Sequence, residues 1–175
     1  RYLPNTKLYK NKIIDINKDM DIDRDDFINK LFDLGYEKKP VVSRTGEMAI
    51  RGYVIDIFPI EFDNPIRIEF WGDTIDSIKY FDLEDQISNT SVDSVKIYPY
   101  TEFLIDGKIG DNIIRKQKYL LNYSDSVSGL WNYVSDSVIF YYDYNQIINS
   151  YSLLRENILE YDSELDDDIK TNYMW

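Results

Sequence analysis

The chain contains no cysteine and no histidine. The absence of cysteine excludes disulfides, thiolate nucleophiles and thiolate metal sites, and it suits a reducing cytoplasm. The absence of histidine removes the commonest general base and the commonest metal ligand. The familiar pairings of a nucleophile with a base cannot be assembled from what remains. We therefore expect no catalytic site, no metal site and no cofactor within these 175 residues.

Long apolar runs and phosphate-binding motifs are also missing. No run approaches the roughly 20 apolar residues that a membrane-spanning helix needs, and the N-terminus does not resemble a signal peptide, so we expect no membrane partner. Neither G-x-x-x-x-G-K-[ST] nor G-x-G-x-x-G occurs. Basic residues are few, with 20 against 32 acidic ones and a net charge of −12. Such a surface repels phosphate backbones, which disfavours direct nucleic-acid binding as the function.

Hydrophobic residues make up 43% of the chain, enough for the core of one sizeable domain or of two small ones. The pattern divides into a module over residues 1–98 and a second part over residues 99–175. The chain starts at Arg1 and ends in Tyr173-Met174-Trp175, which suggests a piece of a longer protein.

We predict that two segments, residues 50–59 and 65–73, are the strands of one hairpin, because both are rich in β-branched and aromatic residues. The second alternates cleanly between apolar and polar positions. In the first, the apolar positions change parity after Gly52, from even (Met48, Ile50) to odd. A strict period of two cannot place all of them in one core, so we predict a β-bulge at Gly52-Tyr53.

With that bulge, six side chains share one face of the sheet, here called the outer face. They are Ala49, Arg51, Asp56, Arg67, Glu69 and Trp71. Arginine and tryptophan are enriched at interface hot spots, and arginine pairs bidentately with carboxylates. The alternative to a binding face is an ordinary surface, in which the two arginines pair with Asp56 or Glu69. A general acid–base pair made of these two carboxylates is disfavoured, because solvated acidic residues are common on sheet surfaces.

In the remainder of the first module, the sequence pattern predicts one helix and further strands. Residues 12–17 form a short strand, and a helix with Asp23 as its N-cap runs to a terminating Gly35. The acidic cluster around Asp23 superficially resembles a calcium loop, but it lacks the central glycine and the terminal glutamate, so helix capping is the better interpretation. Two more strands follow, over residues 74–82 and 91–98, joined by a polar loop. The predicted fold is α+β, an antiparallel sheet with one helix.

Residues 99–175 have a different pattern. We predict helices over 109–122 and 145–161, a short helix over 129–134 and an acidic tail over 164–168. The continuous apolar run over 137–142 is typical of a strand buried on both faces. This order predicts part of an α/β domain.

The hairpin region carries an ordered series of motifs. They are Gly46-Glu47-Met48-Ala49-Ile50-Arg51-Gly52, Asp56-Ile57-Phe58-Pro59, Pro65-Ile66-Arg67-Ile68-Glu69-Phe70-Trp71-Gly72-Asp73, Ile75-Asp76-Ser77-Ile78 and Phe81-Asp82. In this order they resemble the UvrA-interaction domain shared by the excision-repair protein UvrB and the transcription-repair coupling factor (Mfd). The continuations Phe81–Gln86 and Ile97–Phe103 are more similar to the coupling factor than to UvrB. The resemblance covers about residues 1–104.

The resemblance implies a role in recruiting UvrA. Family members use a face with two arginines and an aromatic residue, and the matching positions here are Arg51, Arg67 and Trp71, with Glu69 beside them. Most relatives have Phe where Trp71 stands, and a small residue, a second glycine or an acidic residue where Tyr53 stands. The corresponding domain of UvrB, and a domain that binds nucleic acid directly, remain as alternatives.

The resemblance also implies properties of the parent protein. The parent would be a bacterial, cytoplasmic, ATP-driven DNA translocase that displaces stalled RNA polymerase. Its other domains would bind ATP and Mg²⁺, DNA and the polymerase, and one of them would mask the UvrA-binding face until it is needed.

Overall fold

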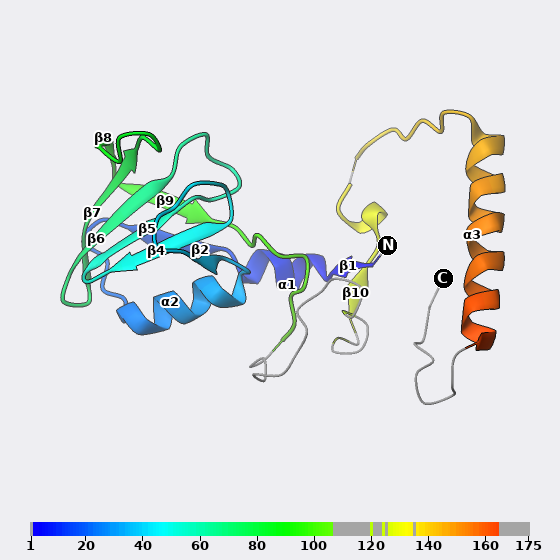
Figure 1. The fold of residues 1–175 in the computed structure, drawn as a ribbon, viewed down its shortest axis with the longest axis horizontal. Helices are drawn as coiled ribbons and strands as arrows, with labels where there is room; N and C mark the ends of the chain where they lie inside the picture. The colour runs from blue at the N-terminus through cyan, green and yellow to red at the C-terminus, as the bar shows by residue number, and fades with distance from the viewer. Residues whose placement is uncertain (1, 107–119, 121–123, 125, 135, 165–175) are drawn as a thin grey trace. The chain divides into compact units, whose positions relative to one another are not determined.

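In a computed structural model the chain divides into two compact units, residues 1–133 and 134–175. The structure describes residues 2–106, 120, 124, 126–134 and 136–164 (Figure 1). The predicted module boundary near residue 98 stays a prediction. The predicted helix over 109–122 lies almost wholly outside the described residues.

A six-stranded sheet organises the first unit (Figure 1). The strand order follows the sequence, and all neighbours are antiparallel except the first pair. The strands are β3 (Glu37–Lys38), β4 (Glu47–Arg51), β5 (Val54–Ile57), β6 (Ile66–Trp71), β7 (Thr74–Phe81) and β8 (Ser88–Val92). The predicted α+β class is confirmed.

The inner face of this sheet carries the main hydrophobic core. Met48, Ile55 and Ile68 are fully buried there. They pack in one cluster with Phe27 and Leu31, the buried residues of the helix α2 (Arg24–Asp33). A separate two-stranded sheet, β2 (Ile14–Asn17) with β9 (Ser94–Ile97), adds its own apolar side chains to the cluster.

Local sequence signals set both ends of α2, as predicted. The Asp23 side chain accepts a hydrogen bond from the backbone N–H of Asp26 at 2.7 Å, which confirms helix capping. Gly35 follows the last turn with a φ of +91°, a left-handed conformation that favours glycine. A Cβ at this position would lie 2.6 Å from Cβ of Thr101, so glycine is also required by space.

The predicted bulge at Gly52-Tyr53 is wrong, because the chain reverses direction there. Arg51 pairs with Val54 across the turn, so β4 and β5 are two strands of a tight hairpin rather than one long irregular strand. Gly52 has a φ of +57° at the first central position, where glycine is typical of a type II′ turn. A register shift does occur nearby, in the β6–β7 pair, where Asp76 is the extra residue.

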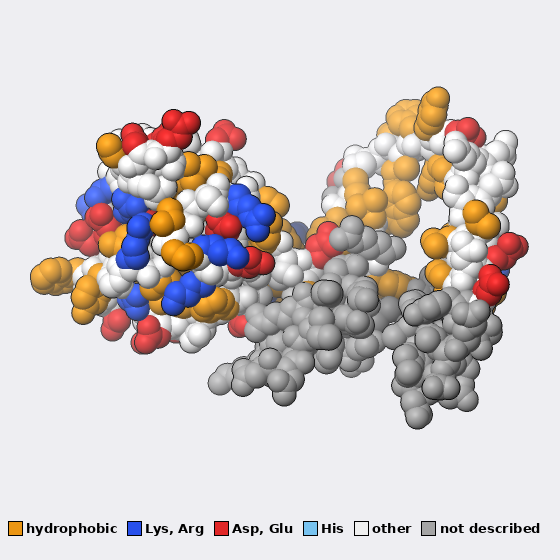
Figure 2. Space-filling view, viewed as in Figure 1, with side chains coloured by type: hydrophobic (Ala, Val, Ile, Leu, Met, Phe, Trp, Pro, Cys, Tyr) orange, Lys and Arg blue, Asp and Glu red, His pale blue; other side chains and the backbone are white. Residues whose placement is uncertain are grey.

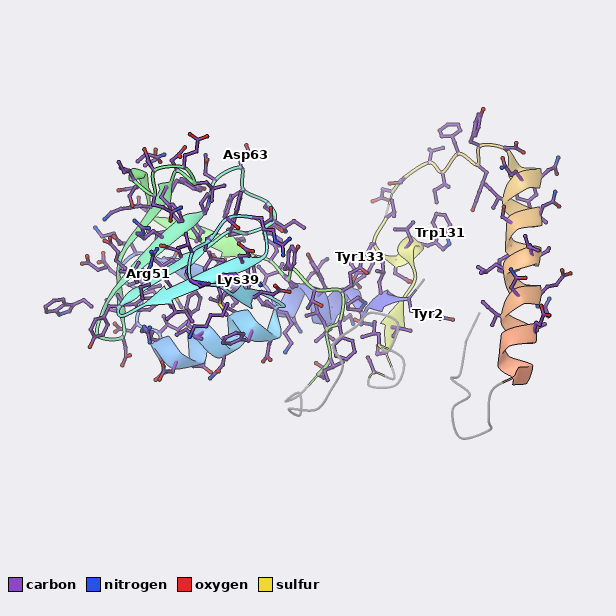
Figure 3. The ribbon with its side chains drawn as sticks, in the orientation of Figure 1. Tyr2, Lys39, Arg51, Asp63, Trp131 and Tyr133 are labelled. Atoms are coloured by element: carbon purple, nitrogen blue, oxygen red, sulfur yellow. The ribbon has the colours of Figure 1, made fainter. Side chains whose placement is uncertain are left out.

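Other elements differ from the prediction in detail. The strand predicted over 91–98 is two strands, β8 and β9, which belong to different sheets. The polar lead-in contains the strand β1 (Leu3–Pro4) and the helix α1 (Thr6–Asn11), neither of which was predicted. The strand β1 pairs with β10 (Val127–Ser128). The predicted short helix is confirmed as a 3-10 helix, Leu130–Asn132, followed by Tyr133, whose hydroxyl donates to the carbonyl of Pro4 at 2.7 Å (Figure 3).

The second unit consists, in its described part, of an extended segment and the helix α3 (Tyr144–Glu164). This confirms the helix predicted over 145–161. The buried strand predicted over 137–142 is wrong, since the segment forms no strand and Phe140 is 89% exposed. An apolar run becomes a buried strand only when neighbouring strands pair with it, and the described residues of this unit supply none. No helix in the described ranges has both the length and the apolar content to cross a bilayer.

Candidate protein-binding surface

The antiparallel register places the predicted site residues on the outer face of the six-stranded sheet. Asp56 of β5 lies directly opposite Arg67 of β6 and opposite Ala49 of β4. Val54 of β5 lies opposite Arg51 on the neighbouring strand β4 and opposite Glu69 on the other neighbour, β6. The two arginines therefore share a face, because cross-strand partners point to the same side of a sheet. In the first unit, basic side chains are interspersed with acidic and apolar ones (Figure 2).

Asp56 is the centre of the outer face. It is fully buried, and both arginines bind it. Arg67 donates from Nε to Oδ1 at 2.7 Å and from Nη2 to Oδ2 at 3.0 Å, while Arg51 donates from Nη2 to Oδ2. One buried carboxylate thus neutralises one of two adjacent arginines, which leaves this cluster with a net positive charge.

Arg67 is mostly enclosed, with a side chain that is 17% exposed. Its guanidinium carbon lies 4.7 Å from the centroid of the Phe81 ring, and Nη1 donates to the carbonyl of Gln86 at 3.1 Å. The hydrogen bonds to Asp56 raise the pKa of Arg67 above its ordinary value. Phe81 itself packs with Ala49 in a small second core on the outer face.

Arg51 is far more accessible. Its side chain is 46% exposed, and it lies on the strand that leads into the Gly52 turn (Figure 3). Within the described part of the chain, its side chain pairs with Asp56 alone. Its remaining donors are therefore available to a carboxylate on another molecule.

Glu69 is engaged within the chain. It accepts from Lys79 Nζ at 2.7 Å and from Ser77 Oγ at 2.6 Å. These hydrogen bonds, that of Lys79 foremost, lower the pKa of Glu69. Glu69 and Asp56 each have their own cationic partner and make no hydrogen bond to one another, so the structure gives no support to an acid–base pair.

Trp71 lies at the end of β6 and is 82% exposed. The adjacent turn, Gly72-Asp73, is at the same end of the sheet as the Gly52-Tyr53 turn, because β5 and β6 pair antiparallel. The Tyr53 carbonyl accepts from the Phe70 N–H at 2.8 Å, and the Tyr53 ring is also exposed. This end of the sheet therefore presents two aromatic rings to solvent beside Arg51.

Sequence reasoning missed four contributors to the face: Ser77, Lys79, Phe81 and Gln86. The signal for Lys79 was its alternation with Ile78 and Tyr80, which puts it on the same side as Glu69. No local signal marks Gln86, because its contact with Arg67 depends on the course of the loop after β7. Within the described residues, no group of three or more acidic side chains is placed to hold a metal ion.

Comparison with known proteins adds to this geometry. The family model described as "UvrB interaction domain" matches residues 14–103, which is more than half of the chain. The chain belongs to the UvrB interaction domain family. The matched range contains the whole six-stranded sheet and every predicted site residue.

Curated relatives named transcription-repair-coupling factor are similar over the same region. One from Staphylococcus epidermidis is 34% identical over 124 residues, which is 71% of this chain and 10% of the relative. Another, from Staphylococcus haemolyticus, is 39% identical over 105 residues, or 60% of this chain and 9% of the relative. A third, from Staphylococcus aureus, is 38% identical over 109 residues, or 62% and 9%. The chain thus spans about a tenth of the length of these relatives.

Proposed function

We propose that this chain is the UvrA-binding module of a transcription-repair coupling factor and that the outer face binds UvrA. The observation that carries the proposal is the pairing of Arg51 and Arg67 on one buried carboxylate, next to the exposed Trp71. Membership in the UvrB interaction domain family and similarity to the coupling factors support it.

The chemistry of the face suits an acidic partner with a shallow apolar depression. Arg51 would pair with a partner carboxylate, because it is half exposed and already held by Asp56 in a fixed position. Trp71 would supply the apolar anchor, since an indole buries a large area with few rotatable bonds. Glu69, whose charge is neutralised by Lys79, would lie at the edge of this contact as part of its polar rim.

We propose that the parent protein is an ATP-driven DNA translocase that acts at stalled RNA polymerase in the bacterial cytoplasm. In this arrangement ATP, Mg²⁺, DNA and the polymerase bind to other domains, and one of those domains masks the outer face until UvrA is required. The net charge of −12 favours this protein-binding role over direct nucleic-acid binding.

The proposal is tested by measuring the affinity of the 175-residue chain for purified UvrA by calorimetry. Loss of a charge-paired interface residue typically costs about 2–5 kcal/mol. Arg51→Ala should therefore weaken binding at least tenfold. Trp71→Ala should do the same, because truncating an aromatic hot-spot residue typically costs about 2 kcal/mol or more. Trp71 is 82% exposed, so Trp71→Ala should leave the unfolding transition where it is. Arg51→Ala removes one of two partners of the buried Asp56, which stays paired with Arg67, so affinity is compared at a temperature where this variant is fully folded.

Two variants serve as matched controls. Lys96→Ala removes one positive charge from the separate β2–β9 sheet, and Phe140→Ala removes an exposed aromatic ring outside the family match. Neither should change the affinity by more than about twofold. Unchanged affinity in both Arg51→Ala and Trp71→Ala would contradict the proposed surface.

A further inference from the structure

Arg51 and Arg67 occupy different environments although they share Asp56. Every terminal group of Arg67 has a partner within the chain: Nε and Nη2 bind Asp56, and Nη1 binds the Gln86 carbonyl. One face of its guanidinium is covered by Phe81. Only 17% of the Arg67 side chain is exposed, against 46% for Arg51, so a partner protein reaches Arg51 far more readily.

The loop that receives Arg67 is closed by its own hydrogen bonds. The Gln86 N–H donates to the Asp82 carbonyl at 3.0 Å, and the Asp82 N–H donates to the Ile87 carbonyl at 3.1 Å. Gln86 has a φ of +61°, a conformation that residues other than glycine rarely adopt. Its side-chain amide donates from Nε2 to the Leu83 carbonyl at 2.9 Å. The loop therefore presents the Gln86 carbonyl from a constrained position.

These contacts form a chain across the outer face. The loop holds Arg67, Arg67 holds the Asp56 carboxylate from two directions, and Asp56 holds Arg51. An isolated exposed arginine samples many rotamers and loses that freedom on binding, whereas an arginine held in place by a fixed carboxylate loses less.

We propose that Arg67 is a positioning residue that fixes Arg51 through Asp56 and does not itself contact UvrA. This inference rests on the proposed function and assigns different roles to the two arginines of the site. Arg51 provides the direct charge contact, and the loop over residues 82–87 becomes part of the site although it lies two strands away from β5. The sequence similarity to coupling factors in Phe81–Gln86 then has a physical role in the same surface.

A double-mutant cycle on UvrA binding tests the proposal. The variants are Arg51→Ala, Arg67→Lys and the double variant, measured by calorimetry at a temperature where each is fully folded. Lysine keeps the charge, but its donors sit on a single nitrogen and cannot bridge Asp56 and the Gln86 carbonyl as the planar guanidinium does. Arg67→Lys should weaken binding about tenfold in the unaltered chain and less than threefold in the Arg51→Ala background. The salt dependence of the affinity should fall in Arg51→Ala and remain unchanged in Arg67→Lys.

The outcomes separate this inference from the proposed function. Equal losses from Arg67→Lys in both backgrounds would mean that Arg67 contacts UvrA directly, and would overturn the inference alone. A lower unfolding midpoint with unchanged affinity would show that Arg67 only stabilises the fold, and would also overturn it. If the unaltered chain does not bind UvrA, the proposed function fails and the inference fails with it.

Discussion

The buried carboxylate of Asp56 offers the sharpest test of how the outer face is built. In Asp56→Asn the side chain keeps its shape and loses its charge, and one carboxylate oxygen becomes an amide group that donates hydrogen bonds. That amide would face guanidinium donors of Arg51 and Arg67, which cannot accept hydrogen bonds. The substitution therefore removes the neutralising charge and replaces attraction by a donor–donor contact.

The size of the effect follows from burial. Removing one partner of a buried ion pair typically costs about 3–5 kcal/mol. Arg51 is half exposed and regains water, while the enclosed Arg67 keeps the Gln86 carbonyl, so we expect the lower end, about 3 kcal/mol. Native domains have only about 5–15 kcal/mol of net stability, so this loss would be large.

Urea unfolding of the 175-residue chain, followed by circular dichroism, measures this loss. With a slope of about 2 kcal/mol per molar urea, the midpoint should fall by about 1.5 M. Asp15→Asn is the matched control, because Asp15 pairs with Lys96 at 3.5 Å and both side chains are more than half exposed. That change should cost less than about 0.5 kcal/mol. An Asp56→Asn midpoint equal to that of Asp15→Asn would refute the reasoning.

Two further predictions concern pH and the turns. Because Lys79 lowers the pKa of Glu69 in the folded state, this stabilisation is complete above the ordinary value of 4.5 and is lost as the pH falls through the folded value. Stability measured from about pH 5 to about pH 3 should therefore decrease less in Glu69→Gln than in the unaltered chain, and identical pH profiles would contradict the pairing. A Cβ on Gly46 would lie 2.3 Å from the Tyr100 ring, whereas one on Gly52 meets nothing within 4 Å, and both have positive φ. Gly46→Ala should therefore cost about 1–3 kcal/mol more than Gly52→Ala in urea unfolding, and equal costs would count against the close contact.

Elements with strong local signals could be predicted from the sequence. The helix α2 has a capping aspartate at one end, a glycine at the other and an apolar stripe between them, and all three signals act within a few residues. The strand β6 alternates clearly between apolar and polar positions, and Gly72-Asp73, a pair of strong turn formers, separates it from β7.

Features that depend on distant partners could not be predicted. Phe81 looks like the exposed end of a strand, yet it is fully buried because Val42, Ala49 and Phe58 converge on it from three other segments. The predicted strand over 137–142 fails for the opposite reason. Its apolar residues indicate burial, but burial needs neighbouring strands, and the described part of the second unit contains none.

The error at Gly52 shows why the site prediction did not depend on the local structure. A one-residue bulge and a two-residue turn both change the parity of the residues that share a face, so each places Arg51 on the same face as Asp56. Parity alone cannot distinguish them. Length can, because one strand over residues 47–58 would have about twice the usual five or six residues. The turn also has a consequence that the bulge lacks: it puts Arg51 at a hairpin tip, at the same end of the sheet as Trp71, where a partner can reach both side chains.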